Sequence, residues 1–151
     1  MPNLSEIVSK DLIVEIMSSK KDNVLKEMIY SLSEGPLIDD INAFYKAVLE
    51  REQLISTGIG YGMAIPHAKL DSVSNMFMMV GRKREGIDFD SVDGKPVYIV
   101  CMIGGSDKSP EEMLQILAQV FLTFKNETFK NKIINAVDTT EIYHYLKSIA
   151  F

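Results

Sequence analysis

The sequence predicts an α/β fold, a mixed β-sheet sandwiched by α-helices in a single domain. Short apolar runs bounded by glycine, proline or aspartate indicate strands, and longer segments with apolar residues every three or four positions indicate helices. The two kinds of segment alternate irregularly, which is typical of a mixed sheet flanked by helices. No repeat, low-complexity stretch or linker divides the 151 residues, so residues 1–151 are expected to form one domain.

Two helices are expected in the first third of the chain. Ser19 is a suitable N-cap for the first helix, and Gly35-Pro36 would end it. Asp39 or Asp40 would open the second helix, which should end near Arg51-Glu52. Apolar residues recur at helical spacing through both segments: Val24, Leu25, Met28, Ile29, Leu32, Ile41, Phe44, Tyr45, Val48 and Leu49.

Three apolar runs are expected to form the sheet. The sequence predicts a short strand at Met63–Ile65 and longer strands at Asn75–Gly81 and Val97–Ile103. The two longer runs are almost continuously apolar, which is typical of central strands covered on both faces. Turn residues separate them and leave room for a further small strand at Ile87–Phe89.

Two capped helices are expected near the C-terminus. In the first, Ser109 suits the N-cap, Pro110 suits the first helical position and Glu112 can complete a capping box. Asp138 with Glu141 should begin the last helix in the same way. The first of these helices carries an apolar stripe of Met113, Leu114, Leu117, Val120, Phe121 and Phe124.

Composition limits the classes of function. The net charge is −5 and the basic triplet Arg82-Lys83-Arg84 is short, so it is interpreted as a solvated strand end and nucleic-acid binding is not expected. No apolar run approaches the roughly 20 residues that cross a bilayer, and the N-terminus lacks the pattern of a secretory signal. The single Cys101 has apolar neighbours and cannot form an internal disulfide, which indicates an inert core thiol and a reducing, cytoplasmic compartment.

The two histidines are the candidates for imidazole chemistry. His144 would point away from the inward stripe of the last helix, so it is expected at the surface. His67 directly follows Pro66, after a glycine-rich loop whose backbone a partner could approach closely. From position alone, a functional His67 and a structural His67 bonded to a loop carbonyl are about equally supported.

Other chemistries fit the surroundings of His67 poorly. No second His or Cys lies at ligand spacing from it, so no metal is expected. The sequence has no GxSxG nucleophile elbow, and its GIGYG loop lacks the Gly-Lys-Ser/Thr of a P-loop. What remains is the imidazole of His67 acting as a nucleophile.

A longer motif surrounds this histidine. Arg51-Glu52 is followed by Ser56-Thr57-Gly58-Ile59-Gly60, then by Gly62 and by Ala64-Ile65-Pro66-His67-Ala68. The arrangement closely resembles the signature of the EIIA components of the bacterial phosphoenolpyruvate-dependent sugar phosphotransferase system. The resemblance is to the fructose/mannitol type, which includes the nitrogen-regulatory branch. It extends more weakly over nearly the whole chain, and it implies the same helix-flanked mixed sheet.

The resemblance also implies a mechanism. His67 would accept a phosphoryl group from phosphorylated HPr on Nε2 and pass it to an EIIB domain in fructose-type sugar uptake, with no metal or organic cofactor. Arg51 would stabilise the transferring group, because its planar fork of donors suits the charge on the equatorial oxygens. Arg51 could equally be a cation at the C-terminus of its helix that interacts favourably with the helix dipole, and it can have both roles. Thr57 and nearby backbone amides are further candidates for binding phosphoryl oxygens.

One position departs from the family's pattern. The family usually carries a second active-site histidine where this chain has Met113, which cannot donate a hydrogen bond to a phosphate. Residue 113 is therefore either a missing donor in the phosphoryl-binding site or a core side chain. Two other functions also remain open: a free-standing nitrogen-regulatory-type EIIA that acts by phosphorylation-dependent binding to a regulatory protein, and a degenerate binding module that is never phosphorylated.

Overall fold

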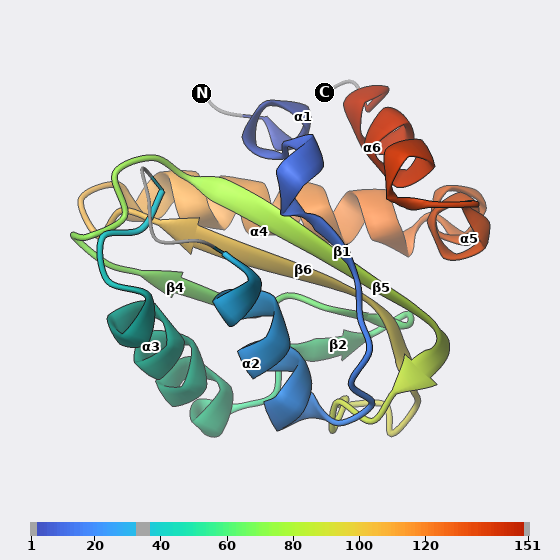
Figure 1. The fold of residues 1–151 in the computed structure, drawn as a ribbon, viewed down its shortest axis with the longest axis horizontal. Helices are drawn as coiled ribbons and strands as arrows, with labels where there is room; N and C mark the ends of the chain where they lie inside the picture. Colours follow the sequence, from blue (N-terminus) through green and yellow to red (C-terminus); the bar gives the residue numbers. More distant parts are fainter. Residues whose placement is uncertain (1–2, 33–36, 150–151) are drawn as a thin grey trace.

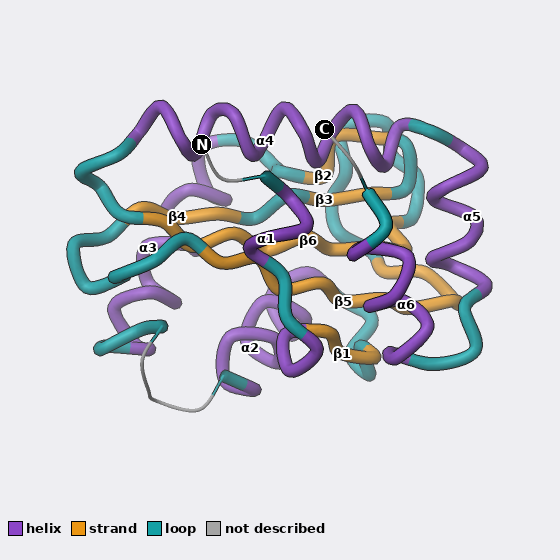
Figure 2. Tube along the Cα trace, turned by 90° about the horizontal axis from the view of Figure 1, so that it is seen from above, coloured by secondary structure: helices purple, strands orange, loops and turns teal. Residues whose placement is uncertain are grey.

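A mixed sheet lies between two layers of helices, as the sequence predicts (Figure 1). The computed structural model describes residues 3–32 and 37–149. Helices α2 (Lys21–Ser31) and α3 (Ile41–Leu54) cover one face of the sheet. The other face is covered by α1 (Leu4–Ile7), α4 (Pro110–Lys125), α5 (Glu127–Asn135) and α6 (Thr139–Lys147). Seen from above, the strands run between these two layers (Figure 2).

The sheet has six strands in the order β1-β5-β6-β3-β2, and β4 also pairs with β6. The strands are β1 (Ile13–Glu15), β2 (Gly58–Gly60), β3 (Met63–Ala64), β4 (His67–Lys69), β5 (Phe77–Ile87) and β6 (Val97–Gly105). The long β5 and β6 are antiparallel, whereas β3 and β4 both run parallel to β6. A 3₁₀ turn, η1 (Lys10–Leu12), precedes β1. The small strand that was considered at Ile87–Phe89 is the end of β5 instead, since β5 continues to Ile87.

Two helix starts follow the predicted capping chemistry. Asp40 precedes α3 and accepts a hydrogen bond from the N–H of Ala43 at 3.0 Å. Asp138 precedes α6 and accepts one from the N–H of Glu141 at 2.9 Å. Each carboxylate thereby satisfies an amide that has no partner within the helix. The predicted end of the first helix at Gly35-Pro36 lies outside the described residues, and α2 ends at Ser31.

Neither predicted serine cap makes the expected side-chain hydrogen bond, and Ser19 is also not at the N-cap position of its helix. Ser19 does not cap α2, because the N–H of Lys21 donates to the carbonyl of Asp88 at 3.0 Å instead. Ser109 occupies the N-cap position of α4, but its side chain makes no capping hydrogen bond. The N–H of Glu112 bonds to the main-chain carbonyl of Ser109 at 3.2 Å. At both helix starts, a main-chain carbonyl thus accepts the amide hydrogen bond that the serine hydroxyl was expected to accept.

Strand β6 divides its side chains between two cores. Val100 and Met102 face the core beneath α2 and α3, whereas Ile99, Cys101 and Ile103 face the core beneath α4. This alternation is the two-residue period of a strand that is covered on both faces, as predicted. Cys101 is fully buried, and burial raises the pKa of its thiol, so it stays in the unreactive protonated form.

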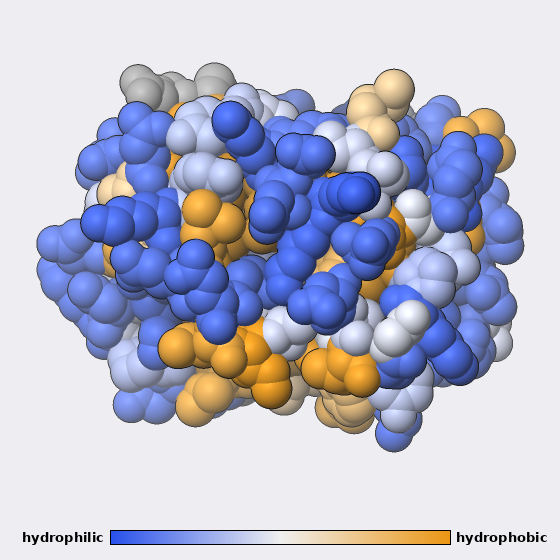
Figure 3. All heavy atoms as spheres, turned by 90° about the horizontal axis from the view of Figure 1, so that it is seen from below, coloured by the Kyte–Doolittle hydropathy of each residue, from blue (hydrophilic) through white to orange (hydrophobic). Residues whose placement is uncertain are grey.

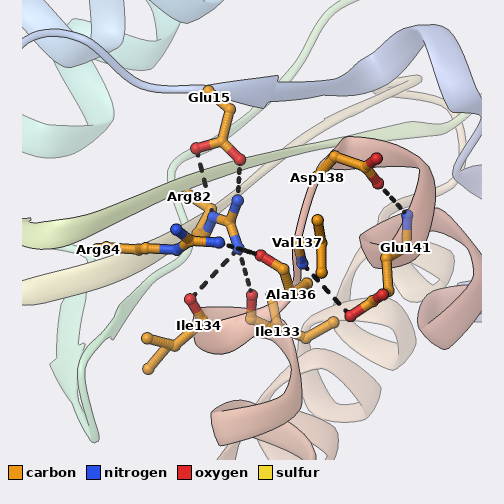
Figure 4. Close-up of polar contacts among 9 residues, drawn as sticks. All are labelled: Glu15, Arg82, Arg84, Ile133, Ile134, Ala136, Val137, Asp138 and Glu141. Carbon is orange, nitrogen blue, oxygen red and sulfur yellow. Dashed lines mark hydrogen bonds and ion pairs between the residues drawn. The ribbon is translucent and has the colours of Figure 1, made fainter.

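The basic triplet is a solvated strand end only in part: Arg84 is exposed and Lys83 is half-buried, but Arg82 is only 2% exposed. Its guanidinium pairs with Glu15 of β1 (Figure 4). It also donates to three carbonyl oxygens at the end of α5: Ile133 at 3.0 Å, Ile134 at 3.3 Å and Ala136 at 2.6 Å. Carbonyls at a helix C-terminus lack partners within the helix, so they can hold a buried cation.

We expect Arg82→Ala to lower the free energy of unfolding by about 3–5 kcal/mol, because it removes one member of a buried charged network and leaves carbonyls unsatisfied. Urea denaturation followed by circular dichroism measures this change. The matched control is Lys95→Ala, since Lys95 is exposed; its effect should stay within about 0.5 kcal/mol. A loss no larger than that of the control would mean that Arg82 is dispensable.

Candidate functional site

His67 begins β4 and lies opposite Ile103 of β6 in parallel register. Paired residues point to the same face of a sheet, so His67 is on the α4 face with Ile103. Its neighbour Ala68 points the other way, into the core beneath α2 and α3. The imidazole is half-buried, so one part of the ring is held by the protein and another part remains accessible.

The ring nitrogen Nδ1 lies 2.8 Å from the carbonyl oxygen of Ile65. A carbonyl oxygen only accepts, so Nδ1 carries the hydrogen of this bond. In the neutral ring, Nε2 then bears a free lone pair. This is the bond to a loop carbonyl that the sequence allowed for a structural histidine. It occupies only one ring nitrogen, so Nε2 is left free for chemistry.

The surroundings of His67 lower its pKa below the ordinary value of 6.5. Desolvation by burial is the largest cause, and the positive charges of Arg51 and Lys69 act in the same direction. The hydrogen bond to Ile65 and the negative charge of Glu52 oppose them. The net effect favours the neutral, nucleophilic imidazole near pH 7.

Arg51 lies in the last turn of α3, which packs against β4. Its Nη1 donates to the carbonyl of Ile55 at 2.9 Å, just beyond the end of the helix. This is the helix-terminal role that the sequence allowed. A guanidinium has five N–H donors, and among the described residues this bond occupies one of them. Four donors remain for other partners.

Thr57 is 2% exposed and is bound to a single carboxylate. Its N–H donates to Oε2 of Glu52 at 3.1 Å, and its hydroxyl donates to Oε1 of the same residue. A hydroxyl has only one hydrogen to donate, so this contact occupies it. Thr57 therefore holds the loop to α3 through Glu52. The sequence analysis did not single out Glu52 for a role of its own, although it stands beside Arg51 in the motif.

Met113 is on the same face of the sheet as His67, but its side chain is 2% exposed and belongs to the core beneath α4. Its methyl group packs on Gly105, where an added Cβ would lie only 2.9 Å away. Gly105 pairs with Lys69, two residues beyond His67 on β4. Of the two alternatives for residue 113, this geometry favours a core side chain next to the site.

The surface beside Arg51 is apolar. Leu54 and Ile55, at the end of α3, are 81% and 61% exposed. Seen from below, the molecule is largely hydrophilic, with apolar atoms gathered along the lower margin of the view (Figure 3).

His144, the other histidine, is exposed on α6 as predicted.

The described residues include neither a candidate metal site nor a candidate membrane span. No group of three or more His, Cys, Asp or Glu side chains in that part of the chain is placed to hold a metal ion. None of the helices in residues 3–32 and 37–149 is both long and apolar enough to cross a membrane.

Fold and site together define an α/β domain that presents one half-buried imidazole at a strand end, with an arginine close by. Residues 6–149 match the model of the family described as "Phosphoenolpyruvate-dependent sugar phosphotransferase system, EIIA 2". The chain therefore belongs to the EIIA type-2 family of this phosphotransferase system, as the motif around His67 predicted.

Relatives in this family carry several names. The chain is 35% identical over 134 residues to the fructose-specific EIIABC component of Bacillus subtilis, of which it spans only 21%. It is 32% identical over 148 residues to the fructose-specific EIIA component of Haloferax volcanii, of which it covers 96%. Identity to the nitrogen regulatory protein of Bradyrhizobium diazoefficiens is 27% over 146 residues.

Solved structures agree with the fold. The nitrogen regulatory protein IIA-Ntr from Neisseria meningitidis superimposes with a TM-score of 0.86 at 25% identity, over 94% of this chain and 97% of that one. The mannitol IIA of Escherichia coli superimposes with a TM-score of 0.77 at 18% identity, over 91% and 97%. At that lower identity, the likeness concerns the fold alone.

We expect nuclear magnetic resonance of the ¹⁵N-labelled protein to find His67 as the Nδ1–H tautomer, with a pKa below 6.5. The unfolded chain would then bind this proton more tightly than the folded one. Over the interval between the two pKa values, the free energy of unfolding should therefore decrease as the pH falls.

His67→Gln should make that decrease shallower, because glutamine does not titrate. Urea denaturation at several pH values measures it, and His144→Gln assigns the second set of ring signals. An Nε2–H tautomer at neutral pH would contradict the assignment of the nucleophile.

Proposed function

We propose that this protein is a cytoplasmic phosphoryl carrier, in which Nε2 of His67 accepts a phosphoryl group from phosphorylated HPr and passes it to an EIIB domain. The observation that carries the proposal is the bond from Nδ1 of His67 to the carbonyl of Ile65, which leaves Nε2 with the free lone pair. In each transfer, the attacking atom forms a bond to phosphorus as the bond to the leaving atom breaks in line with it. The Nδ1 proton stays in place throughout.

Arg51 would act on the charge that appears during this transfer. The equatorial oxygens carry that charge in the transition state, and the phosphorylated imidazole retains it afterwards. The positive charge of Arg51 already acts on His67, and its remaining N–H donors form a planar fork that suits two oxygens at once. Thr57 would contribute by holding the loop, since Glu52 accepts hydrogen bonds from both its hydroxyl and its N–H.

The sequence comparisons support fructose-type sugar uptake as the role. Identity is 35% and 32% to the two relatives named as fructose-specific, against 27% to a nitrogen regulatory protein. The second candidate is a free-standing regulator whose phosphorylation state alters binding to a regulatory protein. It is supported by the TM-score of 0.86 to a nitrogen regulatory IIA. Phosphorylation of His67 is common to both roles.

His67→Ala should abolish phosphoryl acceptance from phosphorylated HPr while the fold is retained, because alanine has no nucleophilic nitrogen. The measurement is transfer of ³²P to the protein, scored as acid-labile and alkali-stable phosphate, with circular dichroism to check folding. His144→Ala is the control and should be labelled like the wild type. Undiminished labelling of a folded His67→Ala protein would refute the proposal, and so would labelling that depends on His144.

Arg51→Ala should slow phosphoryl transfer by roughly a hundredfold or more, because its N–H donors act on charge that is greatest in the transition state. Arg51→Lys should recover only part of the rate, since an ammonium cannot form two parallel hydrogen bonds. Rapid-quench transfer rates beside thermal melting curves test both variants. An unchanged rate together with a large loss of stability would make Arg51 a structural residue only.

A further inference from the structure

Glu52 is a buried carboxylate at the end of α3. The residue is 7% exposed, and three donors surround it: the ammonium of Lys21 at 2.7 Å, the N–H of Thr57 at 3.1 Å and the hydroxyl of Thr57. Removing a carboxylate from water costs several kcal/mol unless such partners compensate. An apolar side chain would fill the same position without that cost, so stability alone does not explain why the position is acidic.

Hydrogen bonds connect this carboxylate to the ring of His67. The carbonyl of Thr57 accepts the N–H of Ile65 at 2.9 Å, and the carbonyl of Ile65 accepts Nδ1–H of His67 at 2.8 Å. Together with the bond from Thr57 N–H to Glu52, they form a chain in which each donor points toward the carboxylate. The carbonyl that orients the imidazole therefore belongs to a backbone segment that Glu52 holds.

The same turn of chain also carries Arg51. The bond from Arg51 to the carbonyl of Ile55 closes residues 51–55, and the bonds from Thr57 to the carboxylate of Glu52 close residues 52–57. Two overlapping loops of the backbone thus hold the arginine and the segment that leads to β2. Loss of the carboxylate would loosen residues 52–57, and with them the Ile55 carbonyl that binds Arg51 and the Thr57 carbonyl that binds Ile65.

We propose that Glu52 is a positioning residue that holds His67 and Arg51 in the geometry for phosphoryl transfer, acting through Thr57 and Ile65. This inference rests on the proposed function. It assigns no contact between Glu52 and the phosphoryl group itself. Lys21, on α2, neutralises the carboxylate and ties it to the neighbouring helix.

Three variants separate positioning from stability. Glu52→Gln keeps the size of the side chain but weakens its acceptance of the Thr57 hydrogen bonds. Lys21→Met removes the ion pair while leaving the contact between Glu52 and Thr57. Glu50→Gln removes the same charge from an exposed position of the same helix and is the matched control. Each is assayed for kcat and KM with phosphorylated HPr, and for the free energy of unfolding.

We expect kcat of Glu52→Gln to fall by about ten- to a hundredfold, because a displacement of about 1 Å in reacting groups has this effect. Its KM for phosphorylated HPr should change little, because Glu52 is only 7% exposed and offers a partner protein little surface to contact. Lys21→Met should lose a comparable amount of stability with a far smaller loss of kcat, and Glu50→Gln should match the wild type. Losses of kcat that simply follow the losses of stability in both variants would overturn the proposal.

A second measurement does not depend on phosphorylation. Ring ¹⁵N signals of His67 in the unphosphorylated protein should show a pure Nδ1–H tautomer in the wild type and in Glu50→Gln, and a mixture of tautomers in Glu52→Gln. The pKa of His67 should also fall further in Glu52→Gln, since the Glu52 charge raises it. If His67 is never phosphorylated, the proposed function fails while these signals still test the positioning role.

Thr57→Val is the variant to use if Glu52→Gln does not fold. It removes one of the two Thr57 hydrogen bonds to the carboxylate and keeps the shape of the side chain. A smaller loss of kcat in the same direction, with altered ring signals, supports the proposal. Wild-type kcat together with wild-type ring signals in Thr57→Val or Glu52→Gln would overturn it.

Discussion

The hydrogen bond between Nδ1 of His67 and the carbonyl of Ile65 depends on a break in the strand at Pro66. Proline has no N–H to donate, so β3 and β4 are separate strands along the same edge of β6. The carbonyl of Pro66 still accepts the N–H of Ile103 at 2.9 Å, which preserves the register across the break. Ile65 lies between the two strands, and its carbonyl accepts the hydrogen bond from the imidazole.

Opposing charges around His67 suit a group that must both accept and release a phosphoryl group. Burial and the positive charge of Arg51 keep the free imidazole neutral, which preserves the lone pair for attack. The same positive charge would stabilise the phosphorylated ring. A phosphohistidine that is stabilised too strongly would not release its phosphoryl group, so in the proposed carrier the opposing charge of Glu52 would help to keep both states accessible. The ammonium of Lys21 pairs with Glu52 and so reduces the effect of its negative charge on His67.

The long strands and the two aspartate caps carry local signals and were predicted correctly, whereas segments that depend on distant partners were not. The apolar runs of β5 and β6 and the caps Asp40 and Asp138 are local features. The strands β1, β2 and β4 have three residues each, too few to show a two-residue period. The burial of Arg82 depends on carbonyls at 133–136 and on Glu15. No local sequence pattern predicts that partners so distant in the chain will surround this arginine. The motif identified His67 and Arg51 as candidates, but the hydrogen bonds that lead to Glu52 appear only in the fold.

The two sides of the site contribute unequally. On the α4 side, the methyl groups of Met113 and Met76 crowd Gly105, so that side provides apolar packing. Thioethers offer no donor to a phosphoryl oxygen. In the proposed carrier, stabilisation of the bound phosphoryl group would then come chiefly from Arg51 and from backbone amides of the adjoining loop. A site that relies on one side has little tolerance for movement there. In the proposed carrier, that requirement would explain why a buried, fully partnered carboxylate is placed at the junction between α3 and this loop, where an apolar residue would suffice for packing alone.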